Sequence, residues 1–376
     1  MTAAAVLKLL DRHPRLLALG EPTHLEEILL DVRNEVFRHL VEEAGYRTIT
    51  IESDCLMGLV VDDYVTAGTG TLDEAMERGF SHGWGVLAGN RELVRWMRAY
   101  NEGRPAADRV HFAGFDGPLE MTGVASPREA LEGLHRSVES EVDAARLDRL
   151  LGADDRWTDP DTLMNPSRSV GRTAEANELR LLAAEMVALL DAQTPHVIAS
   201  TSRAEWERAR LYARTATGLL LYHYWLADPS PQRLNRLVGQ RDAMMAANLL
   251  ATAATGPTFA HAHNSHFQRG KSSMQLGEHH LQWWSAGAIV NAHLGADYAF
   301  VATAVGTIEH RGVSAPPADT VEGYLYEMSD EVVDPRRLPG HLVPRVSPYY
   351  GYAPLDPAEL AALDGLVFVK DIPPPA

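Results

Sequence analysis

The chain has 376 residues, of which 45% are apolar, so it can bury a large core as one domain or as one domain with a sizeable insertion. Its 51 acidic and 34 basic residues give a net charge of −17, which disfavours nucleic acid and anionic membranes as partners because both would be repelled. No apolar run is long enough for a transmembrane helix, and residues 1–10 lack a signal-peptide pattern. The single cysteine excludes an internal disulfide, so we expect a cytoplasmic protein.

The first predicted strand begins at Leu16 and ends where Gly20 interrupts its apolar run. Glu21 and His24 follow three residues apart, so this strand delivers an acid and a base to one loop. Apolar residues at helical spacing then predict a helix over 26–43. A strand, a polar loop and a helix in this order are typical of a parallel α/β unit.

Polar residues also follow the next two predicted strands. The strand over 46–51 is rich in β-branched residues and ends in Glu52, and the strand over 109–115 ends in Asp116. Ligands of open parallel sheets gather beyond the carboxyl ends of the strands. We therefore expect these carboxylates to share one site with the acid and base of the first strand.

Long helical patterns replace this alternation between residues 126 and 254. The predicted helices cover 128–151, 175–192, 203–226 and 232–254. The natural interpretation is a helical cap that forms a wall over the strand ends. Within a single domain over 1–376 we assign 1–125 and 256–376 to an α/β core, with a mostly parallel sheet flanked by helices, and 126–255 to the cap insertion.

The sheet resumes with a fourth strand that begins at 257–260. It runs into three histidines with an asparagine among them: His261, His263, Asn264 and His266. Beyond it we predict a helix near 278–294, a strand over 298–304, loops and short strands over 312–352, and a last strand over 366–370.

These residue types support acid–base chemistry, because histidine is the side chain best suited to take a proton near neutral pH. Glu21 or Glu52 is suited to fix the tautomer of His24 and to stabilise its imidazolium. The later histidines and Asn264 are suited to donate hydrogen bonds to an oxyanion. The chain has no Gly-x-Ser-x-Gly motif for a nucleophilic serine. We therefore expect His24 to activate water directly.

A metal site is the competing interpretation of the same residues. His261 and His263 share one face of a strand and His266 lies close by, with carboxylates available as further ligands. The His-Glu-x-x-His zinc motif is absent. Spacing alone does not separate a metal site from a metal-free base.

Five segments of the chain occur in the same order in the erythromycin esterase family, which this sequence resembles over roughly residues 15–310. They are 20–24 (GEPTH), 51–54 (IESD), 114–116 (GFD), 241–245 (RDAMM) and 262–266 (AHNSH). No single segment is highly specific, but the ordered set is. The resemblance implies a hydrolase that opens the lactone ester of macrolide antibiotics without a metal or other cofactor, using a histidine base.

The resemblance also implies roles for individual residues. His24 corresponds to the base that activates water, Glu21 and Glu52 to the carboxylates around it, and Arg33 to a functional arginine of the family. His263 and His266 resemble the pair that positions substrate or stabilises the oxyanion. The supporting or substrate-binding candidates are Asp116, Arg241, Asn264 and His261.

Two positions depart from the family pattern. Leu25 stands where the family commonly has glycine, and His261 stands where it usually has an aromatic or apolar residue. The first change adds bulk beside the base and the second adds a titratable group. Both bear on the identity of the substrate more than on the hydrolytic machinery.

The sequence therefore predicts hydrolysis of an ester or lactone of a small molecule, macrolide-like or another natural product, by water that His24 activates. Three alternatives stay open at this point. They are a metal-dependent hydrolase, a tailoring enzyme of natural-product biosynthesis that uses the same base for elimination or cyclisation, and a binding protein that keeps the cleft without turnover.

Overall fold

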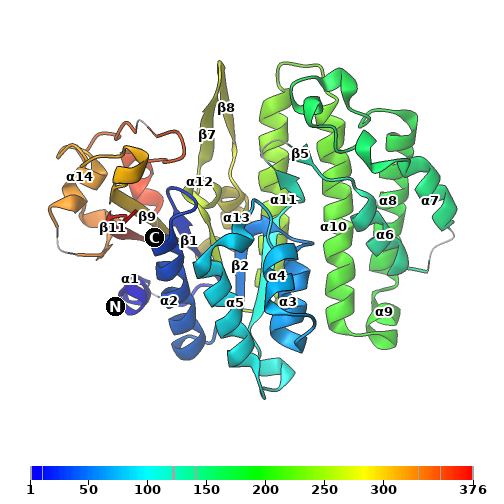
Figure 1. Ribbon diagram of the computed structural model, residues 1–376, viewed down its shortest axis with the longest axis horizontal. Coiled ribbons are helices and arrows are strands. Elements are labelled where there is room, and N and C mark those ends of the chain that lie inside the picture. The colour runs from blue at the N-terminus through cyan, green and yellow to red at the C-terminus, as the bar shows by residue number, and fades with distance from the viewer. Residues whose placement is uncertain are drawn as a thin grey trace.

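A seven-stranded sheet forms the centre of the computed structural model, which describes residues 2–10, 12–120, 123–139, 142–328, 330–347 and 349–374 (Figure 1). Its strands are β1 (Leu16–Glu21), β2 (Thr48–Asp54), β3 (His111–Asp116), β6 (Thr258–His263), β9 (Tyr298–Thr307), β10 (Val332–Val333) and β11 (Gly365–Asp371). They lie in the order β10-β11-β9-β1-β6-β2-β3, and every neighbouring pair is parallel except β10 with β11. The predicted α/β fold with a mostly parallel sheet is confirmed.

Helices cover both faces of the sheet, and this explains why its strands are apolar on both sides. Leu17 and Leu19 of β1 point into one core while Leu16 and Ala18 point into the other, as the two-residue period of a strand requires. The first core is closed by α1 (Thr2–Leu9), α2 (Glu27–Glu43), α3 (Gly58–Ala67), α4 (Leu72–Arg78) and α5 (Ala88–Asn101). The second is closed by α11 (Arg233–Thr255), α12 (Asn264–Phe267), α13 (Ala286–Leu294) and α14 (Val321–Tyr326).

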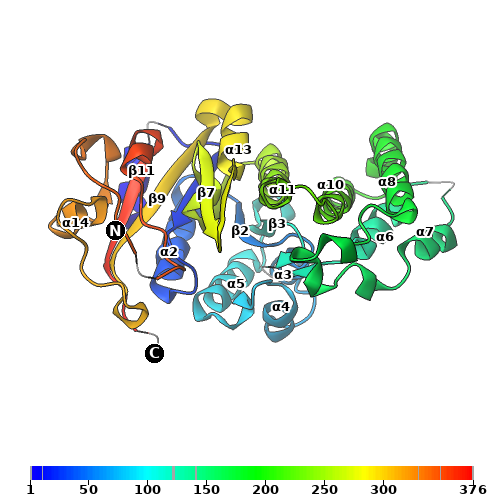
Figure 2. The same ribbon diagram turned by 90° about the horizontal axis from the view of Figure 1, so that it is seen from above.

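A third hydrophobic core is formed mainly by the helices that lie between α5 and α11 in the sequence. They are α6 (Arg128–Arg136), α7 (Ala144–Leu151), α8 (Ala174–Ala192), α9 (Thr194–Ser200) and α10 (Arg203–Leu226). Figures 1 and 2 show them beside the β3 edge of the sheet, with α11 between them and the strands. The division of the chain into a core and an inserted cap stays a prediction. No helix of the described ranges is both long and apolar enough to cross a membrane.

The predicted helix over 128–151 is wrong in one respect, because the structure divides it into α6 and α7. The side chain of Asp143 accepts a hydrogen bond from the backbone N–H of Ala145. An aspartate in this position satisfies an unpaired N–H of a helix start, so a new helix begins there instead of the first one continuing.

A β-hairpin replaces the first part of the helix predicted near 278–294. Strands β7 (Lys271–Leu276) and β8 (His279–Trp284) pair antiparallel around Gly277, whose φ of 57° suits glycine. In β8, Leu281 and Trp283 are buried while their neighbours are exposed, which is the alternation of a strand. Helix α13 begins only after Ser285, whose hydroxyl caps it. The hairpin projects from the body of the molecule (Figure 1).

Candidate active site

The carboxyl ends of four neighbouring strands bring the predicted polar residues together. Glu21, the last residue of β1, is aligned with His263, the last residue of β6. Glu52 of β2 and Asp116 of β3 both bind the guanidinium of Arg241, which comes from α11. Residues far apart in the sequence therefore meet at one edge of the sheet, where parallel α/β proteins place their ligands.

His24 lies in the loop after β1 with its ring between two carboxylates. Its Nδ1 is 2.7 Å from Oε1 of Glu21, and its Nε2 is 3.9 Å from Oε2 of Glu52. Because an ionised carboxylate only accepts hydrogen bonds, the neutral ring carries its proton on Nδ1 and a lone pair on Nε2. Burial lowers the pKa of His24, but Glu52 and Glu21 together outweigh burial and raise this pKa above 6.5.

The imidazole is also the accessible member of this group. The His24 side chain is 34% exposed, whereas the side chains of Glu21 and Glu52 are 4% exposed. Solvent or a ligand therefore reaches the imidazole while the carboxylates behind it stay covered.

Glu52 joins most of the polar groups of the site. Its Oε1 lies 3.2 Å from Nη2 of Arg241 and 3.2 Å from Nε2 of His266, and its Oε2 accepts a hydrogen bond of 2.9 Å from the backbone N–H of His263. Burial raises the pKa of Glu52, but the positive charges of His266, His24 and Arg241 hold it well below its usual value. Glu52 is therefore ionised.

His266, on the one-turn helix α12, is fixed by a second carboxylate. Its Nδ1 is 2.8 Å from Oδ1 of Asp242, whose other oxygen accepts hydrogen bonds of 2.9 Å from Nε1 of Trp283 and from the backbone N–H of Ala286. Burial lowers the pKa of His266, but Asp242 and Glu52 raise it to about 10. This ring is therefore a buried imidazolium at neutral pH, with both N–H groups directed at carboxylates.

His263 is held in the neutral state. Its Nδ1 accepts a hydrogen bond from the backbone N–H of Ser265 and lies 2.8 Å from the hydroxyl of that residue, while its Nε2 lies 3.2 Å from the carbonyl oxygen of Pro22. Burial and the nearby His24 lower the pKa of His263 to about 3. Nε2–H therefore donates to Pro22, and His263 supports the loop that carries His24.

Asn264 and Gly20 tie this edge of the sheet to the neighbouring strand. The amide of Asn264 donates to the carbonyl of Thr303 on β9 and accepts from the N–H of the same residue. A Cβ at Gly20 would lie 2.1 Å from Oδ1 of Asn264, so only glycine fits there. Asn264 thus holds the strand ends together and already uses its amide within the protein.

His261 and Arg33 are both buried on the side of Glu21 away from solvent. Nε2 of His261 is 3.7 Å from Oε2 of Glu21, and burial followed by the charge of Arg33 keeps the pKa of His261 well below 6.5. Arg33, on α2, donates to the side-chain oxygens of Asn34 and Asn90. In the described ranges Arg33 forms no ion pair with a carboxylate. Burial lowers the pKa of Arg33 to about 10, against the opposing effect of the charge on Glu21.

Asp116 is buried beneath Arg241, which binds it with two nitrogens. Nη2 of Arg241 is 2.7 Å from Oδ2 of Asp116, and Nε is 3.2 and 3.1 Å from the two carboxylate oxygens. Burial raises the pKa of Asp116, but Arg241 and then His82 lower it overall. In the described ranges no hydrogen bond uses Nη1 of Arg241, so this nitrogen is the free donor of the site.

The sequence interpretation missed a further histidine, His82, which lies between α4 and α5. Its Nδ1 lies 2.7 Å from Oε2 of Glu120 and its Nε2 lies 3.5 Å from Oδ2 of Asp116. Burial lowers the pKa of His82, but Asp116 and Glu120 raise it overall. Glu120 belongs to the short hairpin of β4 (Leu119–Glu120) and β5 (Gly123–Val124), and it also accepts from the backbone N–H of His82.

Trp84 separates the two histidines and was also missed. The centre of its ring lies 5.2 Å from the ring centre of His24 and 5.4 Å from that of His82. The signal available in the sequence was a histidine beside Gly83 in a glycine-rich passage without a strong periodic pattern. His82 has a φ of 58°, a left-handed conformation that is uncommon outside glycine and that often marks a functional position.

The three histidines of β6 and α12 do not converge. His261 faces Glu21, His263 faces Pro22, and His266 faces Asp242 and Glu52. Across the ranges that the structure describes, no group of three or more His, Cys, Asp or Glu side chains is arranged to hold a metal ion.

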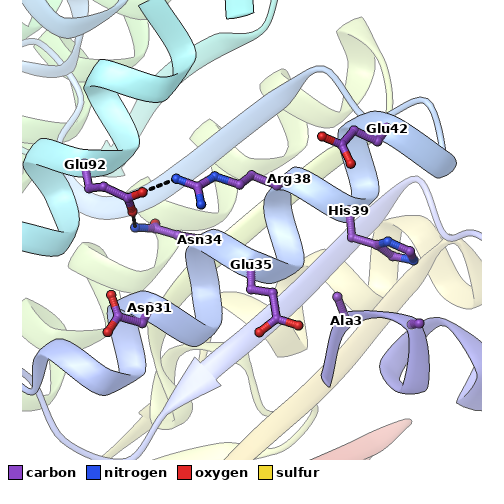
Figure 3. A pocket seen from close by; sticks show the side chains of 9 residues that line it. Ala3, Asp31, Asn34, Glu35, Arg38, His39, Glu42 and Glu92 are labelled. Atoms are coloured by element: carbon purple, nitrogen blue, oxygen red, sulfur yellow. Dashed lines mark hydrogen bonds and ion pairs between the residues drawn. The ribbon is translucent and has the colours of Figure 1, made fainter. Parts of the chain in front are cut away.

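A cavity of 500 Å³ lies away from these strand ends, between α1, α2 and α5 (Figure 3). Its walls carry charged side chains, and Glu92 of α5 binds both Arg38 and Asn34 of α2 across it. Figure 3 shows Glu35 and His39 of α2 projecting on the side of Ala3. None of its lining residues belongs to the strand-end site.

The fold and the site together define a class of protein: an α/β protein with an accessible imidazole, paired carboxylates and buried cations at the carboxyl edge of its sheet. The family model of erythromycin esterase matches residues 41–363. The chain therefore belongs to the erythromycin esterase family, as its sequence motifs predicted.

A curated relative supports the same family. The chain is 25% identical to erythromycin esterase type II of Escherichia coli over 128 residues, which are 34% of this chain. The match spans only 29% of the length of that esterase.

Solved structures agree in fold at low sequence identity. A Bacillus cereus protein superposes with a TM-score of 0.72 and 17% identity, over 98% of this chain and 90% of that one. A mutant of the erythromycin esterase EreC in its open conformation gives 0.68 and 16%, over 97% and 92%. A succinoglycan biosynthesis protein gives 0.66 and 14%, over 97% and 89%.

Proposed function

We propose that this protein hydrolyses an ester or lactone of a small molecule in the cytoplasm, by water that His24 activates. The observation that carries the proposal is the pair formed by Nδ1 of His24 and Oε1 of Glu21 at 2.7 Å, in a ring that is 34% exposed. The carboxylate holds the tautomer that leaves a lone pair on Nε2, which is what a general base requires.

The reaction begins when Nε2 of His24 takes a proton from water while the water oxygen attacks the carbonyl carbon of the ester. Glu21 and Glu52 stabilise the imidazolium that forms, because both carboxylates lie next to the ring. The carbon–oxygen bond of the leaving alcohol then breaks, and the imidazolium returns the proton to the departing alkoxide. The products are a carboxylic acid and an alcohol, with one water consumed.

Positive charge for the tetrahedral oxyanion comes from the α11–α12 side of the site. His266 is a buried imidazolium, and Arg241 keeps Nη1 free of protein partners in the described ranges while Asp116 and Glu52 fix the rest of its guanidinium. Such pre-positioned charges stabilise an oxyanion without reorganising during the reaction. His263 contributes indirectly through its bond to Pro22, and Arg33 acts from behind Glu21 through its charge.

Family membership and the exposed Leu25 beside the base support the proposed substrate class. The named relative in Escherichia coli is an erythromycin esterase, and an exposed Leu25 follows the base here. An exposed leucine beside the base favours a macrolide-like lactone or another apolar natural product over a highly charged substrate.

The test is a screen of macrolides, simple lactones and alkyl esters with the purified protein, read by product mass. Hydrolysis adds one water to a lactone and splits an ester into acid and alcohol, and we expect His24→Ala to remove this change. Elimination or cyclisation would leave a product without added water. The screen is repeated on protein treated with a chelator, and loss of activity that zinc restores would favour a metal-dependent hydrolase. If no mass change depends on His24, the proposed hydrolysis is wrong.

A further inference from the structure

A second cavity, of 240 Å³, lies between α10 and α11, two helices that Figure 1 shows side by side. Its walls come from these two helices alone, and they include Arg214 and Leu221 of α10 and Ala243, Met244, Ala247 and Asn248 of α11. None of them belongs to the proposed catalytic site. The cavity combines one cation with a mainly apolar wall.

The cation, Arg214, has no carboxylate partner among the described residues. Its neighbours on α10 do: Arg208 pairs with Asp63 at 2.5 Å and Arg210 pairs with Asp191 at 3.5 Å. Burial, and then the charge of Arg210, lowers the pKa of Arg214 below its usual value. Arg214 is therefore a half-buried guanidinium whose charge no carboxylate of the described residues neutralises.

The guanidinium is nevertheless oriented. Its Nε donates a hydrogen bond of 3.1 Å to Oδ1 of Asn248, and the amide nitrogen of Asn248 donates to the carbonyl of Phe115 at the end of β3. Asn248 is buried and uses both ends of its amide in this way. The Nη1 and Nη2 groups of Arg214 make no hydrogen bond to the described residues. Two parallel N–H donors on a fixed guanidinium match the two oxygens of a carboxylate.

Most of the remaining wall is apolar, beside the polar side chains of Thr215, Thr217 and Gln240. Leu221, Ala243, Met244 and Ala247 line the cavity, and Gly218 adds no side chain, since a Cβ there would lie 2.8 Å from Cγ of Met244. With water occupying about 30 Å³ per molecule, the volume corresponds to a ligand of about eight non-hydrogen atoms. An aliphatic chain of a few carbons is suited to this wall.

We propose that the cavity between α10 and α11 binds a small organic carboxylate, whose head pairs with Arg214 and whose short aliphatic chain packs against Leu221 and Met244. The proposal does not depend on ester hydrolysis, because it rests on residues outside the catalytic site. It assigns a function to the one guanidinium of this part of α10 that the described residues leave without a carboxylate.

The experiment measures binding of hexanoate to the full chain by isothermal titration calorimetry, with hexan-1-ol and hexylamine as probes of equal chain length. We expect saturable binding of hexanoate and much weaker binding of the neutral and cationic probes. Arg214→Gln should weaken hexanoate binding by about tenfold or more, since it removes a charge-assisted bidentate contact. Arg210→Gln is the matched control, because Arg210 lies one turn away and pairs with Asp191 outside the cavity; it should bind hexanoate as the unmodified protein does.

A second variant keeps the cation and removes the space. Ala247→Phe places a ring in the cavity, and we expect it to abolish hexanoate binding while Arg214 remains. If Arg214→Gln fails to fold, as judged by circular dichroism, this variant alone decides. Absence of hexanoate binding, or affinity unchanged in both variants, overturns the proposal. Binding that is lost in His24→Ala but kept in Arg214→Gln places the carboxylate in the strand-end site as a product and overturns it as well.

Discussion

Nδ1 of His24 lies 2.7 Å from Oε1 of Glu21, three residues earlier at the end of β1. The loop bends over residues 22–25, and Leu25, the residue after His24, has a left-handed φ of 71°. His263 fixes the loop from the neighbouring strand by its contact with the carbonyl of Pro22. The local sequence therefore builds the acid–base pair, and the sheet holds it in position.

The rate of hydrolysis should rise with pH through the pKa of His24, because only the neutral ring accepts a proton from water. Since Glu52 and Glu21 raise this pKa, the midpoint of the rise in kcat/KM should lie above 6.5. Glu21→Gln removes one of the raising charges, so the midpoint should move to lower pH. The same variant should lower the plateau by about 10²-fold or more because the tautomer is no longer held.

The control for this experiment is Glu178→Gln. Glu178 pairs with Arg146 on the surface of the helical region, with both side chains more than 40% exposed. Its pH profile should coincide with that of the unmodified protein. A midpoint that does not move in Glu21→Gln would contradict the assignment of the profile to His24.

Glu52→Gln should strongly destabilise the fold. Glu52 is ionised and buried, and its loss leaves the cations of His266 and Arg241 with one carboxylate fewer. Breaking a buried charge network by removing one member costs about 3–5 kcal/mol, whereas an exposed pair such as Arg146 with Glu178 contributes at most about 1 kcal/mol. Urea unfolding at neutral pH measures the difference. Equal losses in Glu52→Gln and Glu178→Gln would contradict the role of Glu52 as the centre of the network.

The sequence was sufficient to predict the elements whose apolar residues follow a simple pattern. The apolar runs of β1, β2, β3 and β6 predicted a parallel sheet, and the residues after them predicted that carboxylates and histidines would meet at its edge. Both follow from chain geometry, since the strands are buried on two faces and their carboxyl ends point one way.

The sequence was not sufficient where a side chain acts through a partner far along the chain. Asp242 lies in a helix whose sequence pattern is generic. Only the fold shows that Asp242 contacts His266 and raises its pKa, so that the imidazole is protonated. His82 lies in a loop without periodicity, and its partners Asp116 and Glu120 come from β3 and the β4–β5 hairpin. Long-range ion pairs of this kind leave no local pattern in the sequence.

Leu25→Gly should stabilise the protein slightly and weaken binding of apolar substrates. A left-handed conformation costs a residue with a side chain about 1–2 kcal/mol, and glycine avoids this while losing about 0.5–1 kcal/mol of backbone entropy in folding. The net gain should be about 0.5–1 kcal/mol in urea unfolding. Because Leu25 is 47% exposed beside the base, KM for apolar esters should rise while kcat changes little. A lower stability in Leu25→Gly, or an unchanged KM, would contradict this role.

His82→Asn removes the imidazole of His82 but leaves the backbone unstrained. The backbone of residue 82 is left-handed, and asparagine tolerates this conformation. Burial opposes protonation of His82, but Asp116 and Glu120 raise its pKa above 6.5 against the repulsion of Arg241. When folding raises the pKa of a group, its protonation stabilises the fold fully at any pH below its pKa in the unfolded chain. This stabilisation is lost as the pH rises through the pKa of the group in the folded protein. The stability difference between the unmodified protein and His82→Asn should therefore be largest below pH 6.5 and shrink at alkaline pH.

Urea unfolding across this range measures the difference, with Glu120→Gln as the partner variant. Glu120→Gln removes one of the two carboxylates that face His82, so it should reproduce part of the same pH dependence. In the double variant the two effects should be less than additive, because both act on one contact. A difference that is constant with pH would show that His82 stabilises the fold through packing against Trp84 and not through its charge.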